Sequence, residues 1–113
     1  LSLAEFNALD RRIDQMVLAA AGEPFLEHTL RPLHTIFRRI GFIYHAHMAQ
    51  QPSLDGTIDH HLSVLNAIAT RNTERAVAAS DALIAFVDGM FDEMETRIDP
   101  SLLDCSVEAL LST

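Results

Sequence analysis

A chain of 113 residues is long enough for one domain with a single hydrophobic core, and nearly half of its residues are apolar, as a folded protein requires. Its formal net charge of −8 makes nucleic-acid binding by this segment itself unfavourable, because an acidic surface repels phosphate. The sequence has no apolar run of membrane-spanning length, no signal peptide and only one cysteine, Cys105, which favours a cytoplasmic protein without disulfides.

The first predicted helix runs from about Ser2 to Ala21 and ends at Gly22, a residue suited to cap a helix C-terminus. Asp10 falls inside the apolar arc of this helix, and Asp14 lies one turn further on, at the edge of the arc. At helical spacing the arc consists of Leu3, Phe6, Leu9, Ile13, Met16, Val17 and Ala20.

The second predicted helix starts at Pro24, a favoured first-turn residue, and reaches about Gln50. Pro32 removes a backbone donor inside this helix, so the sequence predicts a kink or a break near Arg31. On the same helix His34 is either a cavity residue, one turn before Arg38, or a surface residue. A loop over residues 51–56 follows.

The third predicted helix begins near Thr57 or Ile58 and ends near Arg71. His61 lies within its apolar face, and His60 is expected to point toward solvent. The apolar face consists of Ile58, Leu62, Leu65, Ile68 and Ala69.

The fourth predicted helix is capped by Asn72 or Thr73 and extends to about Arg97. A short terminal helix is expected from Asp99-Pro100 to Leu111. Short connections between long amphipathic helices favour an all-α antiparallel bundle that forms one domain over residues 1–113. The core stripe of the fourth helix consists of Ala76, Ala79, Leu83, Val87, Met90 and Met94.

Asp10 and His61 place ionisable groups where apolar side chains belong. Burying either group without a partner costs several kcal/mol, so each needs a partner, a metal or a ligand. For Asp10 and Asp14 the alternatives are a carboxylate paired with Arg38 or Arg39, or two pocket residues that hold a weak metal or a cationic group. For His61 they are a hydrogen-bonded core histidine or a pocket residue.

Two segments, ALDRRIDQMVLAAAGEPFL and DHHLSVLNAIATRNTERAV, carry a family resemblance. The first is similar to Leu-Asp-x-x-Phe-His followed by Ala-x-Gly-Asn-Pro, and the second to Glu-His-x-x-Ile/Leu-x-Ala-Ile. In this order they resemble the C-terminal effector (FCD) domain of GntR-family transcription regulators of the FadR subfamily. The resemblance implies a dimerising helical bundle that binds a small organic acid in its cavity. It also implies that a winged helix-turn-helix domain and the first helix of the bundle precede this segment.

The resemblance further implies a divalent-metal site built from one Asp and three His. Carried across, these ligands fall on Asp10, Asp14, His61 and Leu83, so two positions match, Asp14 offers an oxygen and Leu83 offers no ligand. Zinc prefers nitrogen and sulfur ligands, so we expect no tightly bound zinc. A weak, oxygen-rich divalent-metal site at Asp10, Asp14 and His61 is the alternative.

The leading hypothesis is therefore the ligand-sensing and dimerisation domain of a GntR-family regulator, which contacts DNA only through the preceding domain. Asp10, Asp14 and His61 would line the cavity with Leu83, and His34 and Arg38 would join them. An arginine there would hold a ligand carboxylate. The alternatives are a module that only dimerises and a small helical metalloprotein. The sequence contains no phosphate-binding loop, nucleophile elbow or di-iron motif, which argues against an enzyme.

Overall fold

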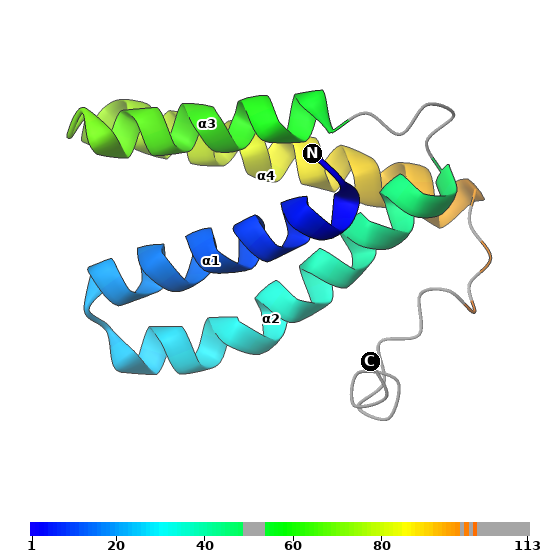
Figure 1. Ribbon diagram of the computed structural model, residues 1–113, viewed down its shortest axis with the longest axis horizontal. Helices are drawn as coiled ribbons and strands as arrows, with labels where there is room; N and C mark the ends of the chain where they lie inside the picture. Colours follow the sequence, from blue (N-terminus) through cyan, green and yellow to red (C-terminus); the bar gives the residue numbers. More distant parts are fainter. Residues whose placement is uncertain (49–53, 98, 100, 102–113) are drawn as a thin grey trace. The chain divides into compact units, whose positions relative to one another are not determined.

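The computed structural model describes residues 1–48, 54–97, 99 and 101, and within this part of the chain there are helices and no strands. The all-α prediction is therefore confirmed. The predicted terminal helix through Leu111 and the thiol of Cys105 lie outside the described residues. The elements in chain order are α1 (Leu3–Ala21), α2 (Pro24–Ile43), the π-helical turn η1 (Tyr44–Met48), α3 (Asp55–Ala69) and α4 (Thr73–Arg97), as shown in Figure 1.

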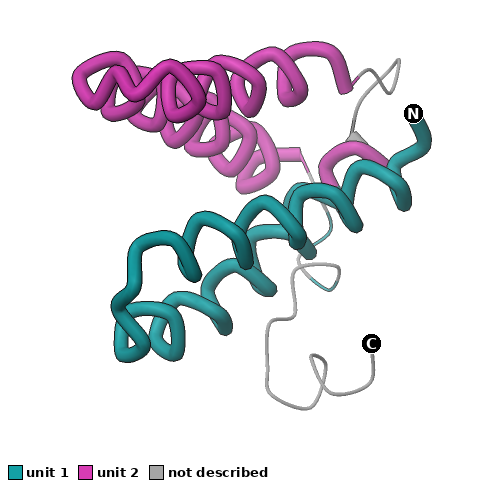
Figure 2. Tube along the Cα trace, turned by 60° about the vertical axis from the view of Figure 1, so that its left-hand side comes forward, with its two compact units in different colours: residues 1–43, 99–113 teal, residues 44–98 magenta. Residues whose placement is uncertain are grey.

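The helices form two compact units, which Figure 2 shows in different colours. Unit 1 comprises residues 1–43 and 99–113, and its helices α1 and α2 form an antiparallel hairpin. Unit 2 comprises residues 44–98, in which α3 and α4 form a second hairpin and η1 contacts α4.

Both ends of α1 are capped, the C-terminal end at the residue that the sequence predicts. Ser2 and Glu5 form a reciprocal capping box: the Ser2 hydroxyl accepts from the Glu5 amide at 3.1 Å, and the Glu5 carboxylate accepts from the Ser2 amide at 2.8 Å. At the other end Gly22 has a φ of 68° and donates its N–H to the Ala19 carbonyl. Glycine adopts this left-handed conformation without a steric penalty, so the helix ends here.

The second helix departs from its prediction in two respects. It continues through Pro32 from Pro24 to Ile43, so of the kink or break predicted near Arg31 the break is absent. Its α-helical part also stops at Ile43, and the following residues form η1 instead of further α-helix. One proline removes one hydrogen bond of many, and packing along α1 holds the other turns in place.

The apolar arc predicted for α1 is only partly correct. Three residues assigned to the arc are exposed, Leu9 and Val17 to almost half and Met16 to 63%, whereas Leu18, outside it, is buried. A helix buries a stripe narrower than the arc that its sequence offers, and here the stripe is centred on the polar positions. Its partly or fully buried members are Leu3, Phe6, Asn7, Asp10, Ile13, Asp14 and Leu18.

In unit 2 the stripe predicted for α4 is confirmed: Met90 and Met94 are buried and its other members are half-buried. The face predicted for α3 is wrong in part. Leu62 and Ile68 are about half exposed, whereas Thr57 and Ala67 are buried. Small residues bring two helices close together, a preference that a pattern of apolar residues does not contain.

His60, expected to point toward solvent, instead packs against α4. Its ring centroid lies 4.7 Å from that of Phe86. Gly56, one turn earlier on α3, approaches the same ring so closely that a Cβ there would lie 3.4 Å from two Phe86 carbons. The Gly56–Phe86–His60 contact therefore fixes the N-terminal half of α3 against α4.

The turn between α3 and α4 differs from that between α1 and α2. Arg71 adopts the left-handed conformation with a φ of 56°, and its amide donates to the Ile68 carbonyl. The next amide, of Asn72, donates to the Ala67 carbonyl, which completes a Schellman motif. The Asn72 side chain then accepts from the Arg75 amide at 3.0 Å and caps α4 as predicted.

Candidate functional site

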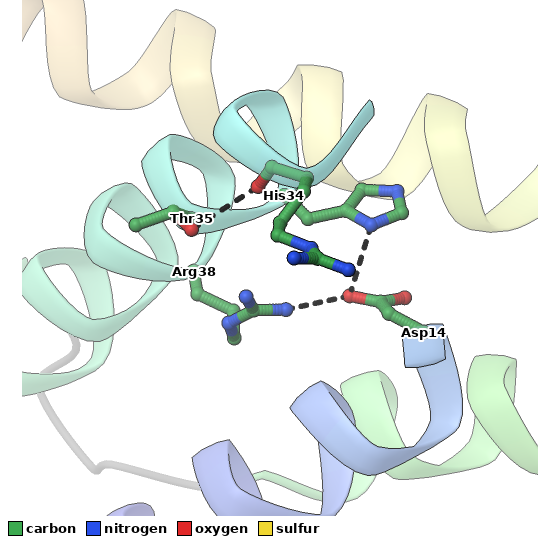
Figure 3. Close-up of polar contacts among 5 residues, drawn as sticks. Asp14, His34, Thr35 and Arg38 are labelled. Carbon is green, nitrogen blue, oxygen red and sulfur yellow. Dashed lines mark hydrogen bonds and ion pairs between the residues drawn. The ribbon is translucent and has the colours of Figure 1, made fainter. Parts of the chain in front are cut away.

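A cluster of charged side chains joins the two helices of unit 1. The Asp14 carboxylate, from α1, accepts a hydrogen bond from Arg38 Nη1 of α2 at 2.7 Å through its Oδ2 atom. His34, one turn before Arg38, places its Nδ1 atom 3.6 Å from the same oxygen (Figure 3). The structure thus brings together three of the six residues predicted to bind ligand, and decides that Arg38 rather than Arg39 pairs with Asp14.

Burial is unequal within this cluster. The Arg38 side chain is 13% exposed, against 29% for Asp14 and 25% for His34. The guanidinium is therefore the most enclosed of the three polar groups, and an enclosed positive charge depends on a nearby anion. Removing one partner of the Asp14–Arg38 pair therefore costs more than it does for an exposed ion pair, which is typically worth about 0–1 kcal/mol.

The geometry follows from the helical spacing of α2. Residues four apart lie on the same side of a helix, so His34 and Arg38 both reach the side of α2 that contacts α1. Thr35, which comes next in the chain after His34, instead donates its hydroxyl to the Arg31 carbonyl at 3.1 Å. The Arg31 side chain forms an exposed ion pair with Glu27.

The neighbouring Arg39 is half-buried, and its Nε atom is fully enclosed without a hydrogen-bond partner among the described residues. A buried donor in this state costs free energy until it finds an acceptor. This second guanidinium on α2 adds positive charge to the part of the helix that holds Arg38.

His61 belongs to unit 2 and is half-buried. Its Nδ1 atom lies 2.7 Å from the Thr57 carbonyl oxygen, one turn earlier on α3. Because a carbonyl oxygen only accepts, Nδ1 carries the proton and donates, and the neutral ring then has its lone pair on Nε2. This is the tautomer in which a histidine accepts a hydrogen bond or binds a metal through Nε2.

A second histidine of unit 2, His45 of η1, was not singled out by the sequence. It is buried, its Nε2 lies 3.5 Å from the Thr57 hydroxyl, and its Nδ1 has no hydrogen-bond partner among the described residues. Burial lowers the pKa of His45 below its ordinary value, because the imidazolium would lose its hydration. The π-helical turn that inserts this ring into unit 2 has no simple signal in the sequence.

Unit 2 contains a further polar contact, between Tyr44 of η1 and Glu93 of α4. The Tyr44 hydroxyl donates to the Glu93 carboxylate at 2.9 Å, and Glu93 also pairs with Arg97 one turn along α4. Burial and then the contact with Glu93 raise the pKa of Tyr44 above its ordinary value. These contacts attach η1 to α4.

The remaining predicted residues, Asp10 and Leu83, are each half-buried, the first on α1 and the second within the apolar stripe of α4. Leu83 is an apolar side chain and supplies no ligand atom. No three His, Cys, Asp or Glu residues are grouped to hold a metal ion within the part of the chain that the structure describes.

Comparison with known proteins gives one match. The FCD domain family matches residues 2–86, about three quarters of the chain. The chain belongs to the FCD domain family. Searches of curated proteins and of solved structures gave no match. None of the helices described here is long and apolar enough to cross a membrane.

FCD domains form the effector-binding region of GntR-family transcription regulators, so the coarse role of this FCD domain is regulatory. The match covers α1, α2, α3 and the first half of α4. It therefore includes both segments that carry the resemblance, together with all six predicted site residues.

Proposed function

We propose that this FCD domain is the effector sensor of a GntR-family regulator of the FadR subfamily. It binds a small organic acid, dimerises, and adjusts DNA binding by a winged helix-turn-helix domain that precedes it in the full protein. The family match supports the regulatory part of this proposal. The chemistry of the charged cluster in unit 1 supports the ligand class.

The observation that carries the proposal is the partly enclosed guanidinium of Arg38. A guanidinium has five N–H donors in a planar fork that matches a carboxylate in two-point geometry. Here Arg38 meets its carboxylate partner through a single pair of atoms, Nη1 and Oδ2. Its other donors fit an additional or alternative anion, and Arg39 adds positive charge on the same helix.

The other predicted residues keep their proposed roles. His61 would accept a hydrogen bond from a hydroxyl group of the effector through Nε2, which the bond to Thr57 leaves as the acceptor nitrogen. Asp10 would offer a hydrogen-bond acceptor from α1 of unit 1, and Leu83 would offer apolar surface from α4 of unit 2.

The metal that the family implies does not fit the residues present. Asp14 stands at one ligand position, but its Oδ2 atom accepts a hydrogen bond from Arg38. A guanidinium beside that oxygen repels a cation, and Leu83 supplies no ligand at another position. We therefore assign no part of the function to a metal.

A dimerisation module without a ligand is the second candidate, and one observation favours it. Val77 and Ile84, two turns apart on one side of α4, are 57% and 67% exposed. Apolar side chains that share a face and are exposed to this extent are typical of an interface. Sedimentation of Ile84→Glu would show a shift toward monomer if this face joins two copies, whereas an unchanged dimer would exclude it.

A thermal-shift comparison separates these functions. The domain is heated with succinate or lactate, with Zn²⁺ or Mn²⁺, and with EDTA, at constant ionic strength. An organic-acid sensor gains stability from a carboxylate and loses none with EDTA. A response to metal and chelator alone would contradict the proposal, and no response to any addition would favour the dimerisation module.

His61→Ala tests the role of unit 2. We expect a weaker stabilisation by lactate and unchanged helical circular dichroism. Succinate, which has no hydroxyl group, is the matched control ligand, and its effect should change less. If lactate stabilises the variant as well as the wild type, His61 is a structural histidine.

A further inference from the structure

We infer that Asp14 is a built-in competitor for Arg38: the carboxylate of the effector displaces Asp14 from the guanidinium, and binding is an exchange of one carboxylate for another. The inference rests on the proposed function, which places an organic acid at this site, and it adds a mechanism of regulation. The exchange frees α1 from a polar link to α2.

The burial of the two partners decides which of them is exchanged. Arg38 is 13% exposed and Asp14 is 29% exposed. If the pair separates, the less exposed guanidinium pays the larger desolvation cost and so needs a replacement anion. Asp14, on the more accessible side, recovers part of its hydration. An incoming carboxylate is therefore favoured over an incoming cation.

The contact geometry points the same way. A carboxylate on a short side chain of α1 reaches Arg38 through one oxygen, the oxygen that also faces His34 at 3.6 Å. A diffusible carboxylate has no such tether and can take the two-point arrangement that a guanidinium prefers. The single hydrogen bond from Arg38 to Asp14 is therefore replaced by two hydrogen bonds from Arg38 to the effector. The second hydrogen bond offsets the advantage that Asp14 has because it is part of the same chain.

The exchange has a structural consequence within unit 1. The Asp14–Arg38 pair is a polar link between two helices whose other side chains, where they are not exposed, are mostly half-buried, and Leu18, at 9% exposure, is the most buried residue of α1. Both ends of α1 keep their caps whether or not the pair is present. Effector binding thus loosens α1 against α2 without unfolding it, which is a two-state element that an attached domain can sense.

The competition has a measurable size. Asp14 occupies Arg38 in most molecules, so only a fraction of the molecules has the guanidinium available for a free carboxylate. The apparent affinity for that carboxylate is the intrinsic affinity multiplied by this fraction. We therefore expect Asp14→Asn to bind succinate roughly fivefold to tenfold more tightly than the wild type. Asparagine keeps the size of the side chain and removes the charge.

The experiment is isothermal titration of the domain with succinate in EDTA at constant ionic strength. Glu27→Gln is the matched control, because it also removes one carboxylate of an Arg–carboxylate pair from unit 1, at the exposed Arg31. It should bind as the wild type does. Arg38→Gln should lose binding, and Arg38→Lys should retain a weak remnant, since lysine keeps the charge without the planar fork.

The outcomes separate the inference from the proposed function. If Asp14→Asn binds succinate no more tightly than the wild type while Arg38→Gln loses binding, the exchange is wrong and the carboxylate site stands. If wild type and Asp14→Asn both fail to bind succinate or lactate, the site and the exchange fall together. Circular dichroism verifies folding, and Asp14→Ser takes the place of Asp14→Asn if the latter does not fold.

Discussion

The two helical hairpins hold together through different chemistry. In unit 1 the contact between α1 and α2 centres on the Asp14–Arg38 ion pair with His34 beside it. In unit 2 the contact between α3 and α4 is more extensive and includes the Gly56–Phe86–His60 contact, and Ala67 of α3 and Met90 and Met94 of α4 are buried. A charged ligand can take the place of either residue of an ion pair, whereas a contact between apolar side chains offers no charged group that a ligand could replace. We therefore expect the exchange of carboxylates at Arg38 to take place in unit 1, and unit 2 to stabilise the fold.

We expect the largest change in the free energy of unfolding from a methionine of unit 2, in comparison with a methionine of unit 1. Met94 is 1% exposed and Met16 is 63% exposed. Met94→Ala leaves a cavity and should lower the free energy of unfolding by about 2–5 kcal/mol, whereas Met16→Ala should change it by less than about 0.5 kcal/mol. Urea denaturation measures both. Equal losses would contradict the assignment of the apolar core to unit 2.

The next effect compares an arginine–carboxylate pair from each unit. Arg38→Gln removes the partly buried partner of Asp14 and should cost about 1.5–3 kcal/mol, because a charged hydrogen bond is lost in an enclosed position. Arg97→Gln removes the partner of Glu93, where the arginine is 52% exposed, and should cost at most about 1 kcal/mol. Unfolding in urea at low salt gives both values, and a reversed order would refute the burial argument.

A smaller effect distinguishes the two turns. Gly22→Ala places a Cβ on a left-handed residue and should destabilise the domain by about 1 kcal/mol. Arg71→Gly relieves the same strain in unit 2, and the flexibility of glycine in the unfolded chain offsets part of the gain. We expect a net stabilisation of a few tenths of a kcal/mol. Thermal unfolding of both variants at one pH measures the two changes in stability. Changes of the same sign in the two variants would contradict this account of the turns.

The smallest effect concerns pH. The pKa of His45 is lower in the folded protein than in the unfolded chain, because burial disfavours the imidazolium. Its contribution to stability is complete above the unfolded pKa, about 6.5, and is lost as the pH falls below it. His45→Gln should therefore reduce the loss of stability between pH 7 and pH 5. His28→Gln, at an exposed position, should leave that loss as it is in the wild type.

Much of the fold could be predicted, because local signals mark the ends of helices. Gly22 and Asn72 each carry a specific capping preference, and both cap where expected. The buried stripe of α4 follows from simple periodicity. The side of α3 that packs on α4 could not be predicted in this way, since Gly56 and Ala67 contribute to it through their small size and weigh little in an apolar pattern.

The candidate site, like the fold, could be predicted only in part. Helical spacing was enough to place His34 and Arg38 on one side of α2, and pairing with an arginine was one of the two alternatives predicted for Asp10 and Asp14. Which arginine formed the pair depended on the register of α1 against α2, which the sequence alone leaves open. The burial of His45 depended on a π-helical turn, whose extra residue rotates every following side chain by a step that helical periodicity does not include.

Nuclear magnetic resonance tests the central claim most directly, through the signals of the backbone amides and the Arg38 Nε–H during titration with succinate in EDTA. We predict saturable shifts concentrated near Asp14, His34 and Arg38, with the Arg38 signal moving most, and no such shifts in Arg38→Gln. Saturable shifts confined to α3 and α4, or small shifts spread evenly along the chain, would contradict the account.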